Sequence, residues 1–458
     1  MKTILAIALI SIRTAVRSRV VIMLLGLLAL TIIGLPLTIK SDGTVGGYVQ
    51  ILVRYTLGSA ELLLSLASIW VGVAAVSLEI QEKQIQLLVT KPVNKLQIWL
   101  GKWLGLIAIN VLALALCGGA TYGLLRWTTR PGRLSAAERQ TLNAEILVAR
   151  QSVPPQPFAV EDRARQILEE RRMQGALPTN VPVATAYKNI RDGLLIEAHA
   201  VRPGGALTWT FPPPSAAWPQ RPFHLRYRIS SSQLAPGKIA GRWSVGRAAG
   251  GQRYEVTQTN LSLGVYTLAV PVTALSGTGA LTVTYANVHA QPVTVLFDPA
   301  DGLRLLFYVG PWETNLVRAL LLMAFRLAFL ASLGVTAGSL FSMPVAALAA
   351  LFGWFVISTG IGLRALFMKE GIRILTPEGP VPAPSLLTTA LELFYHAVKL
   401  LIQPLQTVDA LAWVATGQNV AWSLVAQAFA VQVLLAGGLL MLVGAGVLRR
   451  RELALPMN

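Results

Sequence analysis

The side chains that could carry out chemistry in this sequence are few and widely spaced. The histidines show neither H-x-x-x-H nor HExxH spacing and therefore do not predict a metal site; they are His199, His224, His289 and His396. The single cysteine, Cys117, lies within an apolar run and offers neither a disulfide framework nor a metal-thiolate site. We therefore expect no catalytic residue, no bound metal and no bound cofactor in this chain.

The sequence also predicts no site for ATP hydrolysis. A phosphate-binding loop would read G-x-x-x-x-G-K-[ST], with backbone amides and a lysine around the phosphates. The stretches "LGKWL" around Lys102 and "PGKIA" around Lys238 lack both the upstream glycine and the following hydroxyl residue. Paired carboxylates or a Ser-Lys pair cannot be placed on one face of an apolar helix either, so we do not expect an enzyme.

Two charged residues lie deep inside apolar runs, where a charge usually marks an ion pair, a substrate path or a bundle interior. Glu61 and Arg326 each lie about ten residues into their run, or roughly 15 Å deep at about 1.5 Å rise per residue. Both depths are counted from the same side of the membrane, so the two side chains could pair. A structural ion pair and a role in a substrate path or in gating both remain open.

The composition is that of an integral membrane protein. Of the 458 residues, 54% are hydrophobic and only 13% are charged, which is unlike an ordinary soluble core. The net charge of +18 does not require nucleic acid, because the Lys and Arg residues mostly flank apolar runs. Anionic lipid head groups and membrane topology explain that placement.

Apolar runs near 20 residues predict six membrane spans, at roughly 20–39, 52–78, 100–125, 316–340, 345–367 and 422–448. The first is read as a retained span, since no signal-peptide cleavage pattern follows it. Ahead of it, Leu5, Leu9, Ile12 and Val16 recur at helical spacing, which predicts an amphipathic helix at the membrane interface. The alternative is that this segment extends the first span.

Clusters of Lys and Arg in short connections predict the orientation. They occur before the first span, between the second and third, and at 449–451, which are all on one side if there are six spans. The N-terminus, the C-terminus and residues 79–105 are therefore expected to be cytoplasmic. The insertion at 127–310 is expected outside, and so is a second segment at 368–421 with a re-entrant or interfacial amphipathic stretch.

The insertion divides into two predicted parts. Residues 133–174 carry two charged helical patterns, and 183–307 carry about seven short runs rich in Thr, Val, Tyr and Trp. The second part predicts an antiparallel β-sandwich of jelly-roll type. The fold class is thus an all-α six-helix membrane domain with an inserted α+β region. A set of aromatic residues could line a carbohydrate platform or form the sandwich core: Trp209, Trp218, Trp243 and Tyr254.

The stretch "EIQEKQIQLLVTKPVNKLQIWLGKWLG" at 79–105 is a cationic, amphipathic interlude between the second and third spans. A short apolar stripe is followed by Pro92, and a second helix is expected to begin near Asn94. Because proline lacks the amide hydrogen and clashes with the preceding turn, helix, break and helix should form a small protruding elbow.

The elbow resembles the coupling-helix segment of ABC-2 type transporter permeases, and the whole is closest to the multicopper-enzyme-maturation permease subgroup. The likeness rests on an acidic residue closing the second span, an acidic-basic pair, "LL", "KPVNK" and "LGKWLG", in that order. It covers roughly 1–126 and 312–458 but not the insertion. By matching position it implies that nine residues contact or hinge on an ATPase subunit: Glu79, Glu82, Lys83, Lys91, Pro92, Val93, Lys95, Gly101 and Lys102.

The resemblance implies a permease subunit that moves a substrate, by export, when driven by a separate ATPase subunit that holds ATP and Mg. It also implies a second permease copy, most simply a homodimer, and a multi-pass location in the bacterial plasma membrane. From another class, the alternative is a membrane-anchored binding or assembly protein that acts through its β-sandwich on an outside partner or ligand.

Overall fold

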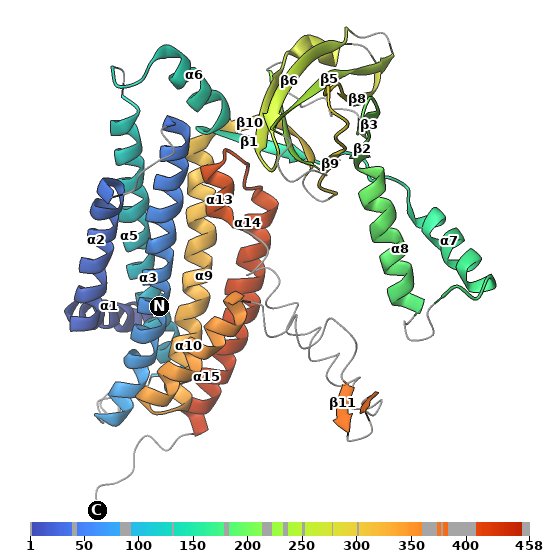
Figure 1. Ribbon diagram of the computed structural model, residues 1–458. Coiled ribbons are helices and arrows are strands. Elements are labelled where there is room, and N and C mark those ends of the chain that lie inside the picture. Colours follow the sequence, from blue (N-terminus) through green and yellow to red (C-terminus); the bar gives the residue numbers. More distant parts are fainter. Residues whose placement is uncertain are drawn as a thin grey trace, which may run out of the picture. The chain divides into compact units, whose positions relative to one another are not determined.

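The computed structural model describes thirteen ranges of the chain, which are 2–38, 44–82, 93–130, 132–177, 183–212, 222–231, 237–249, 252–276, 278–299, 302–359, 373–376, 379–382 and 409–450. The chain forms two compact units. A helical unit comprises Met1–Val148 and Pro311–Asn458, and a β-rich unit comprises Ala149–Gly310. Figure 1 shows both, and each is described by itself.

The helical unit contains the long apolar runs of the sequence as helices. Its principal helices are α1 (Lys2–Arg17), α2 (Arg19–Thr38), α3 (Val45–Gln81), α5 (Lys95–Thr128), α6 (Ala136–Glu145), α9 (Trp312–Leu340) and α10 (Met343–Thr359). After these come α13 (Ala410–Ala415), α14 (Trp422–Ala428), a π-helical stretch η2 (Phe429–Gly437) and α15 (Gly438–Arg450). Serine, threonine, asparagine and aspartate side chains cap several of the N-termini, as at Asn94 before α5.

Four of the six predicted spans are present as helices long and apolar enough to cross a membrane. They are α3, α5, α9 and the continuous run Trp422–Arg450. A fifth span results only if the bent pair α1 and α2 is counted as one. The apolar helix Met343–Phe355 is shorter, and the end of the span predicted at 345–367 lies outside the described residues. The described chain is therefore that of a multi-pass membrane protein with four or five spans rather than a demonstrated six.

The N-terminal segment forms its own helix instead of extending the first span. α1 and α2 meet at Ser18 with a bend of 68°. The bend is compatible with the predicted interfacial helix and also with a broken first span, and α1 has two apolar faces. Ile7, Ala8 and Ala15 are buried, whereas Leu5 and other members of the predicted stripe are exposed.

Helices α3 and α9 lie parallel and in unusually close contact (Figure 1). A Cβ atom added at Gly334 would lie 2.7 Å from the carbonyl oxygen of Ile69, and one at Gly338 would lie 2.5 Å from that of Val73. Glycine at both positions thus lets the two backbones touch, as small residues do in membrane helix pairs. The two glycines are four residues apart, which is the small-xxx-small spacing typical of close membrane helix pairs.

Helix α5 runs antiparallel to α9 and ties it to the rest of the bundle. The indole nitrogen of Trp103 donates to the carbonyl oxygen of Ala328 at 2.9 Å, and that of Trp99 donates to the Thr336 hydroxyl at 3.3 Å. Trp99 also belongs to a small buried cluster with Val76 of α3 and Leu448 of α15. The start of α5 and the ends of α3, α9 and α15 therefore meet at one end of the unit.

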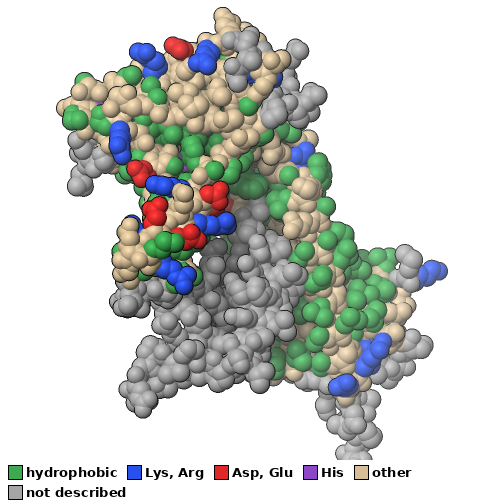
Figure 2. Space-filling model, turned by 90° about the vertical axis from the view of Figure 1, so that its right-hand side faces the viewer, with side chains coloured by type: hydrophobic (Ala, Val, Ile, Leu, Met, Phe, Trp, Pro, Cys, Tyr) green, Lys and Arg blue, Asp and Glu red, His purple; other side chains and the backbone are tan. Residues whose placement is uncertain are grey.

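The outward surface of the helical unit is apolar, as contact with lipid requires. Large exposed hydrophobic residues occur along several helices, among them Leu112 and Leu116 of α5, Phe352 of α10 and Leu442 of α15. On the face drawn in Figure 2, hydrophobic side chains cover broad areas of the helices, and charged side chains gather mainly elsewhere. In water such patches would promote association, so a bilayer is the natural environment of this surface.

The β-rich unit begins with helices and continues as two antiparallel sheets. Its elements are β1 (Val148–Val153), α7 (Glu161–Met173), α8 (Val183–Ala198), β2 (Ala200–Val201), β3 (Ala206–Phe211), β4 (Phe223–Ser231), β5 (Lys238–Ala249), β6 (Tyr254–Leu261), β7 (Val265–Val270), a short 3-10 helix η1 (Val272–Leu275), β8 (Thr278–Asn287), β9 (Val295–Phe297) and β10 (Leu303–Pro311). One sheet has the order β1-β10-β4-β9-β2, with β7 also paired to β4. The other has the order β3-β8-β5-β6.

One aromatic core joins the two sheets. Trp209 and Trp243 are stacked with ring centroids 6.4 Å apart, and both contact Phe297 from the opposite sheet. Both tryptophans are fully buried, so they are core residues and not a carbohydrate platform. Tyr254 packs against the same core, and Trp218 lies outside the described residues.

All seven strands predicted from the sequence are present, with several differences around them. The first of the two helical patterns predicted within 133–174 ends as a helix at Glu145. The residues that follow form β1, because Val148 and Ala149 are buried and β1 pairs with β10. Residues 183–198, predicted as the start of the sandwich, form α8. The sheets of six and four strands also differ from the two equal sheets of a jelly roll.

The compact β-rich unit, Ala149–Gly310, starts later than the insertion predicted at 127–310. α6 belongs to the helical unit, where Leu142 and Ile146 join the main helical core. In the second predicted outer segment, 368–421, the described residues form the hairpin β11 (Arg373–Thr376) and β12 (Gly379–Pro382) and the helix α13. The amphipathic stretch predicted there as re-entrant or interfacial lies outside the described residues.

Candidate functional site

The residues around the predicted elbow form the first candidate site, at the end of the bundle where α3 stops and α5 starts. α3 ends at Gln81, and Glu82 caps it through its backbone amide, which donates to the Leu78 carbonyl oxygen at 2.8 Å. α5 begins at Lys95. Lys83, Lys91 and Pro92, three of the nine predicted coupling residues, lie outside the described residues.

A buried ion pair joins α3 and α5 next to this elbow. The Lys102 ammonium lies 2.5 Å from a carboxylate oxygen of Glu79 and donates to the Ala75 carbonyl oxygen at 2.6 Å. The Lys102 side chain is only 2% exposed and that of Glu79 is 20% exposed. A buried charge needs such a partner and additional hydrogen bonds to be tolerated. The two residues therefore brace the helices on either side of the elbow.

Gly101 is also placed inside the bundle, at the contact between α5 and α1. A Cβ at Gly101 would lie 2.7 Å from the Cβ of Ile7, and one at Gly105 would lie 2.7 Å from the carbonyl oxygen of Ala8. Both positions therefore need glycine because another helix backbone lies against them. This contact gives a physical reason for the two glycines of "LGKWLG".

The predicted coupling residues thus fall into two groups. Gly101 and Lys102 are buried against other helices of the same chain, and Glu79, which is 20% exposed, is held in the ion pair with Lys102. Glu82 is exposed, and Val93 and Lys95 are partly exposed at the start of α5. Among the coupling residues that the structure describes, this second group is the more accessible to another protein.

Glu61 and Arg326 form the second candidate site, in the middle of the bundle. The Arg326 guanidinium donates to the Glu61 carboxylate, joining α9 to α3 as the equal depths of the two residues suggested. The Arg326 side chain is 30% exposed and the Glu61 side chain is 17% exposed. The ion pair lies on the same helix pair as the close glycine contacts, so it adds a directional bond to a tight apolar interface.

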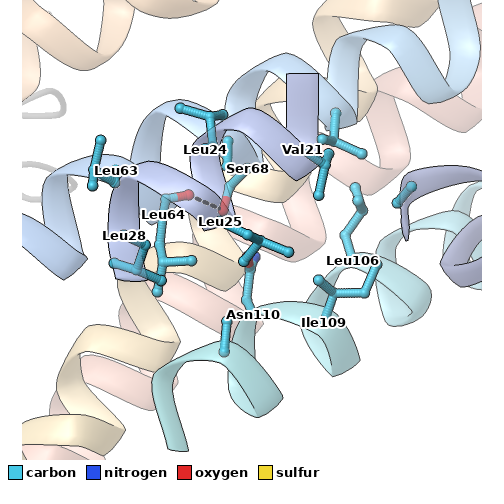
Figure 3. A pocket seen from close by; sticks show the side chains of 14 residues that line it. Val21, Leu24, Leu25, Leu28, Leu63, Leu64, Ser68, Leu106, Ile109 and Asn110 are labelled. Atoms are coloured by element: carbon cyan, nitrogen blue, oxygen red, sulfur yellow. Dashed lines mark hydrogen bonds between the residues drawn. The ribbon is translucent and has the colours of Figure 1, made fainter. Parts of the chain in front are cut away.

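An intramembrane cavity between α2, α3 and α5 contains a polar residue that sequence reasoning missed. The cavity has a volume of about 30 Å³ and is lined by apolar side chains apart from Ser68 and Asn110 (Figure 3). Asn110 is 5% exposed, and its Nδ2 atom, which points toward Leu25, has no hydrogen-bond partner among the described residues. The sequence signal was available, since Asn110 interrupts an otherwise apolar run.

Gln432 is a second buried amide within an apolar run. Gln432 lies in the π-helical stretch of the last span, and its Oε1 atom has no hydrogen-bond partner among the described residues. π-helical turns inside α-helices are frequent where a helix serves a function. Asn110 and Gln432 are therefore candidate functional residues for the same reason as an intramembrane charge: each is a buried polar group within an apolar run.

The β-rich unit holds a buried histidine on the outer side of its larger sheet. His224 of β4 pairs in register with Leu306 of β10 and Ala269 of β7. Burial, and secondarily the positive charge of Arg150, lowers the pKa of His224 to about 4. The imidazole is therefore neutral in the folded protein at neutral pH.

Neither metal ligands nor similarity to a known protein assigns a role to these sites. Among the described residues, no group of three or more His, Cys, Asp or Glu side chains is arranged to hold a metal ion. No protein-family model matches the sequence, and no curated protein matches it. The fold and the helix lengths define the class, which is a multi-pass helical membrane protein with a separate antiparallel β unit.

Proposed function

We propose that this chain is the permease subunit of an ABC-2 type transporter, driven by a separate ATPase subunit that holds ATP and Mg. In this proposal, two copies of the chain form the membrane path, the elbow end of the bundle is cytoplasmic, and the β-rich unit lies outside a bacterial plasma membrane. Export is the direction that the sequence resemblance favours. Two features support this function: the order of the motifs at 79–105, and the packing of the described residues on either side of them.

The buried bridge between Glu79 and Lys102 is the observation that carries the proposal. α3 has 37 residues and α5 has 34, whereas about 20 residues cross the hydrocarbon core. At about 1.5 Å per residue, α3 is roughly 55 Å long and extends well beyond that core. An anchor needs neither this extra length nor a charged brace between the two helices. Such a brace makes the helix pair move as one body when its connecting segment is pushed.

Coupling to the rest of the bundle follows from the same contacts. Displacement of α3 by a partner at Glu82 to Lys95 would carry α9 with it, because the glycine contacts and the Glu61–Arg326 pair fix these two helices together. Packed helices transmit such shifts with little deformation. In a pair of permease subunits, this motion would open or close a path at the interface between the copies.

Affinity purification of the intact chain in mild detergent tests the proposal. An ATPase subunit should co-elute with the wild-type chain, and Glu82→Ala with Lys95→Ala should reduce its recovery without lowering the yield of the permease. Arg126→Ala with Glu313→Ala is the matched control, since it removes an exposed ion pair at the opposite end of α5. That control should retain the ATPase.

Failure of any ATPase to co-elute with the wild-type chain would remove the driving subunit from the proposal. The alternative is then a membrane-anchored binding or assembly protein that acts through its β-rich unit. If the ATPase co-elutes but both double variants retain it equally, the elbow is not its docking site, and the coupling assignment is wrong.

A further inference from the structure

The turn between β6 and β7 presents an apolar surface that the core of the β-rich unit does not use. Leu261, Leu263 and Val265 are 54%, 69% and 50% exposed, respectively. The outer face of β6 before this turn carries Glu255, Thr257 and other polar residues, so three large aliphatic side chains within five positions break its pattern. We call residues 261–265 the apolar tip.

The apolar tip is a fixed structure and not a loose loop. The Leu263 amide donates to the carbonyl oxygen of Ile229 at 2.8 Å, and the Tyr266 hydroxyl donates to that of Leu261 at 3.0 Å. The Tyr266 ring lies so close to Gly264 that an added Cβ would clash with it. These contacts hold the turn to the sheets on both sides, and yet they leave its aliphatic side chains in contact with solvent.

Leu263 has a backbone conformation that a leucine rarely adopts. Its φ is +67°, and it is the one non-glycine residue with positive φ in the described chain. Asparagine, aspartate and glycine are the usual residues in this region, because a bulky side chain is strained there. Strain of this kind persists where the surrounding structure enforces it and often marks a functional position. Here it accompanies the most exposed aliphatic side chain of the turn.

A positively charged residue lies beside the apolar tip on each of the neighbouring strands, β5 and β4. Leu261 is the register partner of Lys238 on β5, and Val265 is the register partner of Arg228 on β4. Directly opposed residues in antiparallel strands share a face, so each aliphatic residue lies next to an exposed cation. The strand region from His199 to Gly310 is basic as a whole, with nine Lys or Arg against three Asp or Glu.

We propose that the apolar tip docks the β-rich unit on an anionic lipid bilayer surface, with Leu261, Leu263 and Val265 inserted among the acyl chains and Lys238 and Arg228 against the lipid phosphates. Aliphatic residues flanked by cations are the combination that binds a charged membrane interface. The unit is joined at both ends to the helical unit, so a bilayer is always nearby at a high effective concentration. This inference does not rest on the proposed transport function.

The experiment uses the full-length chain in nanodiscs, with an environment-sensitive fluorophore on Ser262→Cys in a Cys117→Ala background. Discs contain either phosphatidylcholine alone or phosphatidylcholine with phosphatidylglycerol, each with and without a lipid that carries a nitroxide on its acyl chain. We expect blue-shifted emission and nitroxide quenching in the anionic discs, and weaker quenching in the neutral discs or at high salt. The same label on Thr257→Cys, on the exposed face of β6, should show neither effect.

Two variants separate insertion from charge. Leu263→Asn keeps a residue suited to positive φ and removes the aliphatic group, so it should lower the lipid-bound to free ratio by roughly tenfold or more. Arg228→Gln leaves the apolar tip intact and should lower the ratio by roughly fivefold in anionic discs only. Val309→Asn, which removes an exposed aliphatic residue of β10, is the control and should have no effect.

Absence of nitroxide quenching in anionic discs would overturn the proposal. Shielding of the label from aqueous iodide without any nitroxide quenching would mean that protein covers the apolar tip, and the assignment to lipid would be wrong. Equal quenching in Leu263→Asn and the unmodified chain would also overturn it, because the leucine would then make no contact with the bilayer.

Discussion

Removal of one partner from the Glu79–Lys102 pair should strongly destabilise the helical unit. Truncating one member of a buried ion pair leaves the other charge without compensation, at a cost of about 3–5 kcal/mol. Glu79→Ala should approach this range, because Lys102 is 2% exposed and would retain only the Ala75 carbonyl oxygen. Lys102→Ala should fall in the same range of about 3–5 kcal/mol, because the Glu79 carboxylate would lose its partner and its second oxygen is already buried without a hydrogen bond among the described residues.

The double variant Glu79→Leu with Lys102→Met should lie within about 1 kcal/mol of the unmodified chain, since an apolar pair of similar volume can replace a buried ion pair. The assay is unfolding by SDS in mixed micelles, followed by circular dichroism. Glu79→Ala with Lys102→Ala completes a cycle with the two single variants, and the coupling energy of that cycle measures the pair.

The exposed pair of Arg126 and Glu313 is the control for the cycle. Its atoms lie 2.7 Å apart, but its side chains are 63% and 46% exposed, so breaking it should cost less than about 1 kcal/mol. If Glu79→Ala and Lys102→Ala have effects no larger than this control, or if Glu79→Leu with Lys102→Met is as unstable as the single variants, the pair does not brace the two helices.

Three further outcomes follow from close packing, an unpaired amide and a buried imidazole. Gly101→Leu should push α1 away, because Ile7 lies against this position, and should lower the free energy of unfolding by about 1–3 kcal/mol. Gly119→Leu has open space around it and should be neutral. Proteolysis within α1 and unfolding by SDS measure both variants. Asn110→Leu should raise the free energy of unfolding by about 1–2 kcal/mol by removing a donor without a partner, and a lower value would show that the amide is satisfied by a molecule in the cavity. His224 is neutral when folded, with a pKa of about 4 against 6.5 ordinarily, so stability of the β-rich unit is full above pH 6.5 and is lost as the pH falls toward 4, by up to about 3 kcal/mol. His224→Gln should flatten that pH dependence in thermal unfolding of the β-rich unit, and an unchanged dependence would assign it to other groups.

Local pattern was sufficient for much of the fold. The apolar runs at 52–78, 100–125, 316–340 and 422–448 became long helices, and the alternating runs between 205 and 297 became strands, because each depends on the periodicity of neighbouring residues. The errors occurred where burial outweighed local preference. The segment after Glu145 forms β1 because β10, which is distant in the sequence, provides a partner strand. The residues of β1 themselves carry no strand pattern that would predict this pairing.

The candidate site shows the same division. Charge and depth within the apolar runs singled out Glu61 with Arg326, whereas Glu79, Gly101 and Lys102 were singled out by the resemblance of 79–105 to a coupling segment. The sequence could not tell that the last three face inward, since their partners are a carbonyl of the preceding helix and the backbone of α1 nearly a hundred residues away. Local sequence determines which residues can ionise or allow close approach. Only the packing of distant helices decides which of them are buried, because burial depends on what the rest of the chain places against them.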